Sequence, residues 1–202
     1  MRHPVRPPLR VVLLDADGVL QRRRPGLVRG LLRLGGPRFL VDAMRAEVRC
    51  LTGEHDFPDA LAEVMRRHRI PRSLDEVAGG WLDIVVDPRR LELVDALRAR
   101  GVRVALATNQ HRFRGLHMRD VLRLDDRFDA AYYSFELRVA KPDAAFFTRI
   151  LDDLGEHPPG SVLFVDDLPG NVRAARTLGI DARLHLWRTG AAGLRRTLAS
   201  RL

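Results

Sequence analysis

The amino-acid sequence predicts an α/β fold: a Rossmann-like parallel sheet with helices on both faces, plus a small inserted helical cap. Two observations predict this fold. From residue 89 onward, short apolar runs alternate with longer helical patterns, and strands that alternate with helices usually pair in parallel. Between the first apolar run and this region, residues 21–88 show helical periodicity only. We therefore expect residues 1–20 and 89–202 to form an α/β core, with residues 21–88 inserted as the cap.

The first strand is predicted at residues 11–15, "VVLLD", a β-branched and leucine run that ends in an acid. The basic, proline-rich residues 1–10 before it are expected to form a loose lead-in. Within the cap, apolar residues at helical spacing predict helices at 37–51, 57–70 and 73–86. The last of these opens with Ser73 and has Glu76 three residues later, which is a capping-box pattern.

The rest of the chain alternates between the two kinds of element. Helix 142–155 has proline in its first turn and ends on glycine, and helix 89–101 also ends on glycine. The predicted order is helix 89–101, strand 102–109, helix 112–124, strand 130–137, helix 142–155, strand 161–167, helix 169–179, strand 180–187 and closing helix 189–202.

Basic residues dominate the charge balance, with a formal net charge of +9 from 34 arginines and one lysine against 26 acids. A positive charge of this size favours binding to nucleic-acid backbones only when the basic residues cluster on one face of the protein. Here arginine is spread over almost every predicted helix, and no aromatic residues interleave with it as a stacking platform. We expect no nucleic-acid partner, and we attribute the composition to a bias toward arginine.

The number of cysteines and the length of the apolar runs exclude further classes of protein. Cys50 is the only cysteine, so the sequence has neither a disulfide framework nor a cysteine metal site. The apolar run at residues 11–14 is too short for the core of a secretion signal, and no stretch is long enough to span a membrane. We expect a soluble, cytoplasmic protein without a membrane partner.

Polar groups gather at the ends of the predicted strands, where ligands bind in sheets of this kind. The sequence places there Asp15, Asp17 and Gly18; Thr108 and Asn109; Lys141, just before a helix; and Asp166 with Asp167. Several carboxylates at one place repel each other unless a cation joins them. Oxygen donors without histidine or cysteine select a hard ion, of which Mg²⁺ is the expected one. A carboxylate can also attack phosphorus to form an acyl phosphate, while Lys141 and a hydroxyl neutralise and orient the phosphoryl oxygens.

Four motifs carry a family resemblance: "DADGV" at 15–19, "ATN" at 107–109, "AKPD" at 140–143 and "FVDD" at 164–167. In this order and on these elements, they resemble the four motifs of the haloacid dehalogenase-like hydrolase superfamily. The helical block after the first motif resembles the superfamily's small helical cap. The double aspartate of the fourth motif, with this cap position, is similar to sugar-phosphate phosphatases and to the phosphatase domain of soluble epoxide hydrolases.

The resemblance implies a role for each motif residue. Asp15 would attack phosphorus and bind Mg²⁺. Asp17 would protonate the leaving oxygen and later activate water, and its backbone carbonyl would also contact the metal. Thr108, the Asn109 amide, Lys141 and the loop at Gly18 would bind the phosphoryl group. The resemblance further implies Asp167 as a direct metal ligand, with Asp166 close behind and Asn171 either supporting them or serving as an ordinary polar residue of a first helical turn.

Lys141 is the only lysine in a chain of 34 arginines. A compact ammonium can fit between a carboxylate and a phosphoryl oxygen, whereas a planar guanidinium needs more room and a different geometry. A change to arginine would be harmless on the surface but damaging at this position. The chain's one lysine therefore strengthens the site prediction, although chance is the alternative explanation.

The motifs favour a phosphatase that hydrolyses a small phosphomonoester, such as a sugar phosphate. The acid at Asp17 suits a phosphate ester, because its leaving oxygen needs a proton. A phosphomutase of the same superfamily and a binding module without turnover stay open as alternatives. Three features near the site have two interpretations each: the Arg22–Arg24 cluster binds anions or forms a solvated hinge, His111 contacts substrate or lies on the surface, and Trp81 lines the pocket or packs between cap helices.

Overall fold

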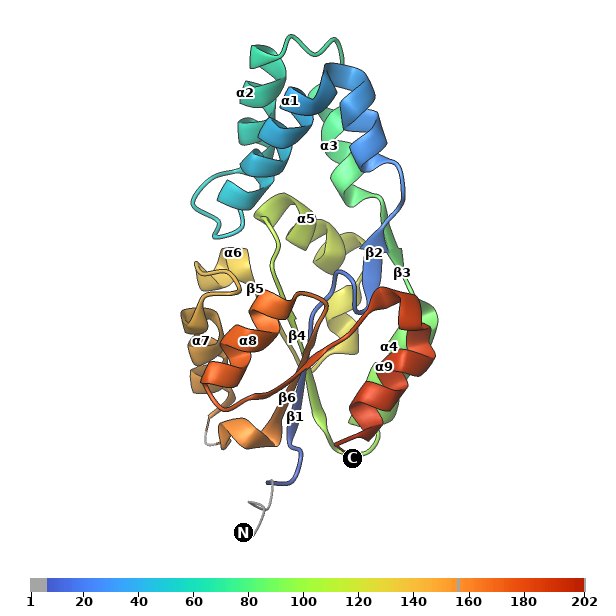
Figure 1. Ribbon diagram of the computed structural model, residues 1–202, viewed down its shortest axis with the longest axis vertical. Coiled ribbons are helices and arrows are strands. Elements are labelled where there is room, and N and C mark those ends of the chain that lie inside the picture. Colours follow the sequence, from blue (N-terminus) through green and yellow to red (C-terminus); the bar gives the residue numbers. More distant parts are fainter. Residues whose placement is uncertain (1–6, 156, 202) are drawn as a thin grey trace.

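The structure, a computed structural model, describes residues 7–155 and 157–201, so most of the lead-in expected at residues 1–10 lies outside it. Two parts are stacked along the long axis of the molecule (Figure 1). A sheet with helices on both sides forms the lower part, and a group of helices from residues 27–82 lies above the carboxyl ends of its strands. Among the described residues, no helix has the length and apolar composition that crossing a bilayer requires.

Five strands of the described chain form one parallel sheet in the order β5-β4-β1-β6-β7, which confirms the predicted fold class. The strands are β1 (Val11–Leu14), β4 (Arg103–Thr108), β5 (Ala130–Tyr133), β6 (Val162–Asp166) and β7 (Asp181–Leu184). The first strand lies at the centre, with Leu13 opposite Ala105 of β4 and Phe164 of β6. The carboxyl ends of β4, β1 and β6 are therefore neighbours.

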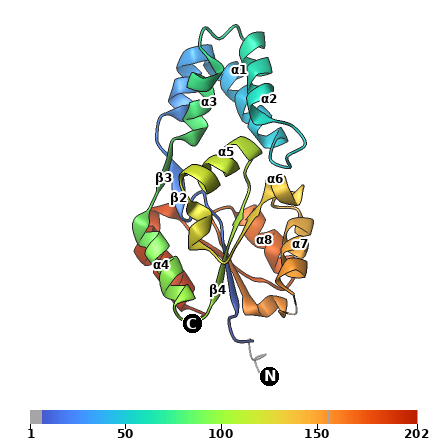
Figure 2. The ribbon, with the colours of Figure 1, turned by 180° about the vertical axis from the view of Figure 1, so that it is seen from behind.

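Alternating side chains of β1 divide the core between the two faces of the sheet. Val12 and Leu14 pack into one apolar cluster with the helices α4 and α9, and Val11 and Leu13 pack into the other with α7 and α8. In Figure 2, α4 and α7 lie on opposite sides of the sheet. The helices that cover the faces are α4 (Pro88–Arg98), α7 (Ala144–Leu154), α8 (Pro169–Thr177) and α9 (Gly190–Ala199). A strand buried on both faces reads as a continuous apolar run, as "VVLL" does.

The upper part, here called the helical group, has its own apolar core. It consists of α1 (Leu27–Arg49), α2 (Phe57–Arg67) and α3 (Leu74–Leu82). The first helix starts ten residues before the predicted range and is broken at Gly36, where φ is +74° and Pro37 follows. The predicted capping box is confirmed, because Ser73 and Glu76 each accept a hydrogen bond from the other's backbone N–H.

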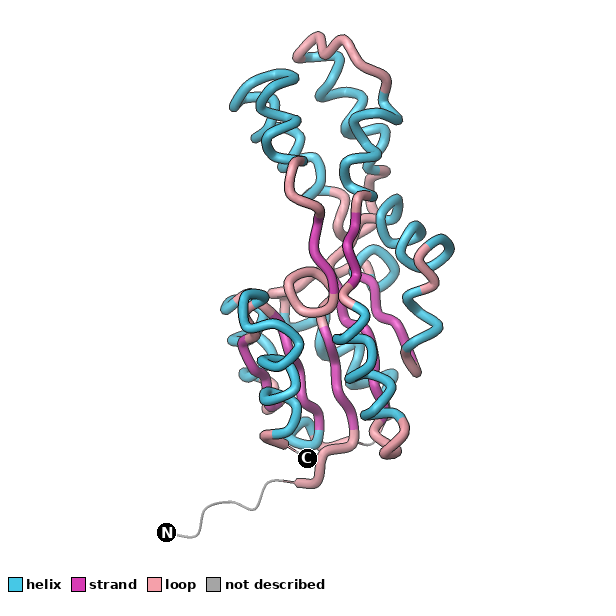
Figure 3. Tube along the Cα trace, turned by 90° about the vertical axis from the view of Figure 1, so that its right-hand side faces the viewer, coloured by secondary structure: helices cyan, strands magenta, loops and turns pink. Residues whose placement is uncertain are grey.

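Two short strands connect the helical group to the sheet, and the sequence analysis missed both. Strands β2 (Gln21–Arg23) and β3 (Ile84–Val86) pair in antiparallel fashion, and Figure 3 shows them side by side between the two parts. The prediction of a helix through residue 86 is therefore wrong at its end, since α3 ends at Leu82. Three-residue strands carry too little pattern to be recognised from sequence, and they exist here because each satisfies the other's backbone groups.

Another correction concerns residues 134–137, which were predicted as strand and form the short helix α6 (Ser134–Leu137). Strand β5 pairs with β4 only as far as Tyr133 opposite Thr108, where β4 itself ends. Beyond that point the chain has no strand to pair with and turns into a helix. The remaining short elements are α5 (Arg112–Leu116), the π-helix η1 (His117–Val121), and the 3₁₀ turns η2 (Leu124–Arg127), η3 (Pro159–Ser161) and η4 (Trp187–Thr189).

Arg90 ties the connection between the two parts to the C-terminal segment. Its guanidinium is 1% exposed and donates to the backbone oxygens of Val19, at 2.5 Å, and Trp187, at 2.9 Å. It also pairs with Asp87, which caps α4, and lies 3.7 Å from the centre of the Trp187 ring. The base of the two connecting strands is therefore fixed by a buried arginine that donates to Asp87, Val19 and Trp187.

We predict that Phe57→Ala destabilises the protein by about 3–5 kcal/mol, the usual cost of removing a buried aromatic ring. Phe57 is fully buried at the start of α2, with its ring 4.1 Å from that of His111 and 4.9 Å from that of Trp81. Urea unfolding followed by circular dichroism measures the loss. Val48→Ala, at a side chain that is 64% exposed, is the control and should change stability by less than about 0.5 kcal/mol. Equal small losses for both variants would contradict the prediction.

Candidate active site

Three carboxylates meet where β1 and β6 end. Asp15 directly follows β1, Asp166 is the last residue of β6, and Asp167 comes next. Each offers an oxygen, and these oxygens lie within 4.8 Å of one another. Neighbouring parallel strands bring their carboxyl ends to the same edge, which is why Asp15 and Asp166, 151 positions apart in the sequence, belong to one acidic cluster.

Lys141 lies between two of these carboxylates. Its Nζ donates to Asp15 Oδ1 at 2.8 Å, to Asp166 Oδ2 at 2.7 Å and to the backbone oxygen of Ala107 at 2.8 Å. All three ammonium protons are used, and the residue is only 4% exposed. Burial opposes the charged form of Lys141, but Asp15 and Asp166 outweigh it and raise the pKa of the ammonium above its ordinary value. Lys141 is thus a charged group that the protein has fixed in place.

The side chain of Asn109 holds the segment that carries Lys141. Its amide donates to the backbone oxygen of Lys141 at 2.8 Å, and its Oδ1 accepts from the backbone N–H of Lys141 at 2.9 Å. This paired contact fastens the end of β4 to the loop before α7. By holding the backbone of Lys141, the Asn109 side chain fixes the point from which the ammonium group extends.

Asp15 and Asp167 both lie in surroundings that disfavour their charged form. Burial raises the pKa of Asp15 to about 7, with Asp166 and Asp17 adding to the rise and Lys141 opposing it. Burial, followed by repulsion from Asp166, raises the pKa of Asp167 to about 6. Burial is the main cause of both shifts, and a cation bound by these carboxylates would favour their charged forms. Oxygen donors at this spacing fit a hard divalent cation.

Asp166 differs from Asp167 in having both oxygens engaged by protein donors. It is fully buried and accepts from Lys141, from the backbone N–H of Leu168 at 2.7 Å and from the Asn171 amide at 3.0 Å on each oxygen. Asp167 is half-buried at the edge of the cluster. The geometry leaves Asp167 better placed than Asp166 to contact a ligand directly, and it places Asn171 behind Asp166.

Gly18 is required by the close approach of its loop to Asp167. Its φ is +77°, and a Cβ at this position would lie 2.0 Å from Oδ2 of Asp167. Any side chain here would collide with a carboxylate of the cluster. The glycine predicted from the first motif thus lets the loop after β1 lie against the end of β6.

Asp17 lies in the same loop but in very different surroundings. Arg114 donates to both of its oxygens, at 2.5 and 2.8 Å, and Gln110 and Gln21 donate to it at 2.9 and 3.3 Å. Burial alone would raise the pKa of Asp17, but Arg114, with the Gln110 amide and Arg23 helping, lowers it to about 2. Asp17 is therefore held as a carboxylate in this arrangement.

Arg114 and Gln110 were not singled out from the sequence. Both are buried, at 0% and 2% exposure, and they lie in the "NQHRFR" segment that borders the site. The same Gln110 amide also donates to the Thr108 hydroxyl at 3.1 Å. Thr108, which was predicted to bind phosphate, is fully buried. No sequence signal distinguishes Arg114 from the 33 other arginines.

The other predictions near the site have mixed outcomes. The interpretation of His111 as a surface residue is wrong: its ring is fully buried against Phe57, and its Nδ1 accepts from the backbone N–H of Arg114. Burial, followed by the charges of Arg114 and Arg23, lowers the pKa of His111 to about 3. Trp81 is fully buried in the core of the helical group, so the packing interpretation is confirmed.

Two arginines of the Arg22–Arg24 cluster form ion pairs with acidic side chains. Arg23 forms an ion pair with Glu47 of α1, and Arg24 forms one with Asp83. Arg22 is exposed on β2, with its guanidinium 5.8 Å from the centre of the Trp187 ring. Two of the three arginines therefore fasten the connecting strand to its neighbours.

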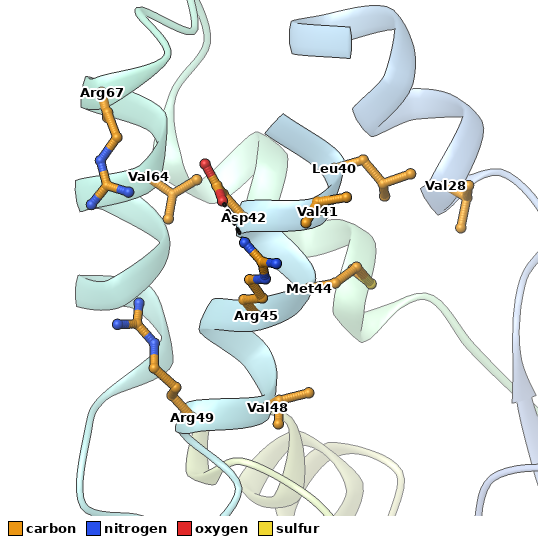
Figure 4. A pocket seen from close by; sticks show the side chains of 10 residues that line it. All are labelled: Val28, Leu40, Val41, Asp42, Met44, Arg45, Val48, Arg49, Val64 and Arg67. Carbon is orange, nitrogen blue, oxygen red and sulfur yellow. Dashed lines mark ion pairs between the residues drawn. The ribbon is translucent and has the colours of Figure 1, made fainter. Parts of the chain in front are cut away.

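A pocket of ≈ 750 Å³ lies away from the carboxylates, on α1 and α2 (Figure 4). Figure 4 shows Leu40, Met44 and Val48 pointing to one side of α1, and Arg49 and Arg67 pointing toward each other on the other side. None of the residues that line this pocket belongs to the acidic cluster. Its walls are mostly apolar and also carry Asp42, Arg45, Arg49 and Arg67.

Comparison with known proteins identifies the family. Residues 9–179 match the family described as haloacid dehalogenase-like hydrolase. This chain belongs to that family of hydrolases. The match covers all four motifs and the inserted helical group, which confirms the resemblance seen in the sequence.

Haloacid dehalogenase-like hydrolases of known activity and structure are among the relatives. The chain is 27% identical over 190 residues to a phosphoglycolate phosphatase of Rhodospirillum rubrum, covering 85% of this chain and 77% of the relative. A predicted hydrolase of Porphyromonas gingivalis superposes with a TM-score of 0.80 at 20% identity, covering 96% of this chain and 99% of the other. An enzyme of Bacteroides thetaiotaomicron, solved with magnesium and inorganic phosphate, gives 0.74 at 20% identity, covering 87% and 93%.

We predict that Lys141→Met destabilises this hydrolase by about 3–5 kcal/mol at about pH 8, because removing one partner leaves buried carboxylates without their counter-charge. Lys141→Arg should also be destabilising, since a forked guanidinium does not fit among the three acceptors of the ammonium. Urea unfolding measures both losses. Arg173→Met, on the exposed side of α8, is the control and should cost less than about 0.5 kcal/mol. A fully stable Lys141→Arg variant would contradict this account.

Proposed function

We propose that this hydrolase is a Mg²⁺-dependent phosphatase that acts on a small phosphomonoester through an aspartyl-phosphate on Asp15. The observation that carries the proposal is the pair of carboxylates in the loop after β1, with a fixed ammonium beside the first of them. One carboxylate beside an ammonium is suited to attack phosphorus. A second one nearby is suited to handle the proton of the leaving oxygen, which a halide would not need.

The acidic cluster supports Mg²⁺ as the cofactor. Its three carboxylates converge within 4.8 Å, and two of them have raised pKa values that an added cation would relieve. We propose that Asp15, Asp167 and the backbone carbonyl of Asp17 hold the ion, with Asp166 behind them. Bound there, Mg²⁺ would neutralise phosphoryl oxygens and favour attack by an anionic nucleophile.

The reaction would proceed in two steps on the residues of this chain. In the first, an Asp15 oxygen forms a bond to phosphorus as the bond to the alkoxy oxygen breaks, and Asp17 gives that oxygen a proton. Asp17 must take up this proton beforehand, which requires at least one of its oxygens to leave Arg114. In the second, Asp17 takes a proton from water, whose oxygen attacks phosphorus and releases phosphate and free Asp15. Lys141 would pair with the phosphoryl group throughout, and Asn109 would hold both Lys141 and a phosphoryl oxygen.

The helical group would serve as the cap that selects the substrate. The helices of residues 27–82 stand over the carboxyl ends of the strands. We propose residues 21–88 as the cap, and residues 1–20 and 89–202 as the α/β core that carries the reactive groups. The β2–β3 pair connects the two parts. A space between a compact cap and a sheet edge suits a small phosphorylated metabolite. Sugar phosphates are the expected class, and phosphoglycolate is a second compound to test because a relative carries that name.

We predict that the purified protein releases phosphate from at least one such ester, that EDTA prevents the release, and that Asp15→Asn reduces it below detection. The amide cannot form the acyl phosphate. A panel of sugar phosphates, phosphoglycolate and p-nitrophenyl phosphate, assayed for free phosphate, checks the prediction. Asp152→Asn, an exposed aspartate on α7, is the matched control and should keep the wild-type rate.

Release by Asp15→Asn at the wild-type rate would refute the nucleophile assignment. A folded wild-type protein that binds Mg²⁺ and hydrolyses no ester would refute the phosphatase proposal. Transfer of the phosphoryl group within the substrate, instead of its release, would identify a phosphomutase.

Mg²⁺ binding should strengthen as the pH rises from about 5.5 to about 8. The raised pKa values, about 7 for Asp15 and about 6 for Asp167, mean that protons compete with the ion in this range. Without metal, the native state binds these protons more tightly than the unfolded chain, so the contribution of both groups to stability falls between about pH 4 and about pH 7. Mg²⁺ should reverse that fall at higher pH.

The Mg²⁺-induced rise in Tm, titrated at both pH values, measures this competition. We expect an apparent affinity at about pH 8 that is at least about tenfold higher, as expected when a single proton with a pKa near 7 competes. Asp167→Asn should weaken binding at the higher pH. Equal affinities at the two pH values would contradict the assignment of this cluster as the metal site.

A further inference from the structure

The outer side of α1 exposes apolar and basic side chains together. On the opposite side of this helix, Phe39, Ala43 and Ala46 are buried in the core of the helical group. No exposed residue of α1 is acidic. Apart from Pro37, the exposed residues are four aliphatic ones and five arginines, here called the α1 face: Val28, Leu32, Val41, Val48, Arg29, Arg33, Arg38, Arg45 and Arg49. One surface therefore offers both apolar area and positive charge.

The α1 face is continuous across the break in the helix. Its members within residues 38–49 recur three or four positions apart, which puts them on one side of the helix. Val28 of the first half borders the same pocket as Val41 and Val48 of the second half (Figure 4). A neighbouring hollow joins Val28 to Leu32. The aliphatic side chains of both halves thus form one patch, and contiguous exposed patches of this kind usually bind a partner.

The positive charge of the α1 face is largely unbalanced. Among the described residues, the ion pairs of its arginines are limited to Arg45 with Asp42, at 3.8 Å, and the Arg45 side chain stays 75% exposed. Asp42 itself lies closer to His68 Nε2, at 2.8 Å. Glu47, the other acid of α1, forms an ion pair with Arg23 of β2. An anionic partner would therefore meet several guanidinium groups that no carboxylate occupies.

This combination sets α1 apart from the other helices that the structure describes. Four of the eight large apolar side chains that are exposed in the described chain lie on α1. Helix α9 also exposes two neighbouring arginines, Arg195 and Arg196, but none of those eight side chains. Exposed arginine is thus common in this protein, whereas exposed arginine mixed with aliphatic side chains is concentrated on α1.

We propose that the α1 face binds an anionic lipid surface. The guanidinium groups would contact phosphate headgroups, and the aliphatic side chains would enter the boundary between headgroups and acyl chains. Arginine suits this position because its stem can lie along apolar surface while its charge stays at the headgroups. The sequence analysis expected no membrane partner because no apolar stretch is long enough to span a bilayer, but binding at the surface requires no such stretch.

Two other occupants fit the α1 face less well. A nucleic acid would use the arginines, but it would leave the aliphatic side chains without an apolar partner, and the face has no aromatic ring for stacking. A second copy of this chain would bring the same five arginines close to one another, and like charges repel. A bilayer with anionic headgroups offers negative charge and apolar volume over one broad area, so it matches both features.

The experiment measures binding of the full-length protein to vesicles by co-sedimentation. The vesicles contain phosphatidylcholine alone or phosphatidylcholine mixed with an equal amount of phosphatidylglycerol. Arg45→Gln/Arg49→Gln removes charge from the α1 face, and Val41→Ser/Val48→Ser removes apolar area from it. All four side chains are exposed, and circular dichroism confirms that the variants fold.

A matched control removes the same charge elsewhere. Arg195→Gln/Arg196→Gln neutralises two exposed arginines of α9, so its net charge equals that of the Arg45→Gln/Arg49→Gln variant. A loss that is specific to the α1 face can therefore be told from a general effect of net charge.

We expect wild type to bind the mixed vesicles and not the neutral ones, with a partition coefficient that falls as the salt concentration rises. The Arg45→Gln/Arg49→Gln variant should lower this coefficient at least about tenfold, because each arginine at an anionic surface contributes about fivefold. The Val41→Ser/Val48→Ser variant should lower it at least about threefold, since less apolar area enters the boundary. The α9 variant should stay within about twofold of wild type.

Several results would overturn the proposal. Failure of wild type to bind the mixed vesicles would refute it, and equal losses for the two arginine variants would assign the binding to net charge. Unchanged binding by Val41→Ser/Val48→Ser, with duplex DNA bound more tightly than vesicles at the same salt concentration, would identify a nucleic-acid surface. A dimer on gel filtration that the serine variant converts to a monomer would identify a second copy as the occupant. The proposal goes beyond the proposed phosphatase function and does not depend on it, since soluble esters test that function separately.

Discussion

The arrangement of the site depends on one ammonium group buried among three strand ends. Lys141 Nζ contacts Asp15 after β1, the Ala107 carbonyl in β4 and Asp166 at the end of β6. Two aspartates this deeply buried would repel each other and favour protonation if the ammonium were absent. Because each contact comes from a different strand, the ammonium also fixes the ends of the three central strands relative to one another. The loops that carry Asp17, Asn109 and Asp167 start from these fixed points.

Asp15 and Asp17 lie only two residues apart, yet their surroundings shift their pKa values in opposite directions. Burial leaves Asp15 with a raised pKa in spite of Lys141, whereas Arg114 lowers the pKa of Asp17 in spite of burial. The difference comes from the positively charged partner of each carboxylate. Asp15 shares the Lys141 ammonium with Asp166, whereas both terminal nitrogens of the Arg114 guanidinium donate to Asp17. Similar burial therefore has opposite outcomes at two positions of one loop, because the charged partners of the two carboxylates differ.

Much of the site could be predicted, because its residues follow apolar runs that are easily recognised as strands. Parallel pairing then brings Asp15, Thr108 and Asp166 to one edge, whatever the details of packing. The connecting strands β2 and β3 could not be predicted, since three residues carry no usable pattern and their stability comes from pairing between residues 61 to 65 positions apart. Arg114 could not be predicted for a similar reason: its partner Asp17 lies 97 residues away, and a chain with 34 arginines gives no signal for the one that contacts it.

The single lysine has a practical consequence for the study of this hydrolase. Lys141 is the only side-chain amine in the sequence, and it is 4% exposed with every proton engaged. Reagents that modify amines will find almost nothing to react with on the folded surface, because its positive charge comes from arginine. Acylation of that side chain would therefore report directly on opening of the proposed catalytic centre, without the background of surface lysines that obscures such labelling in most proteins.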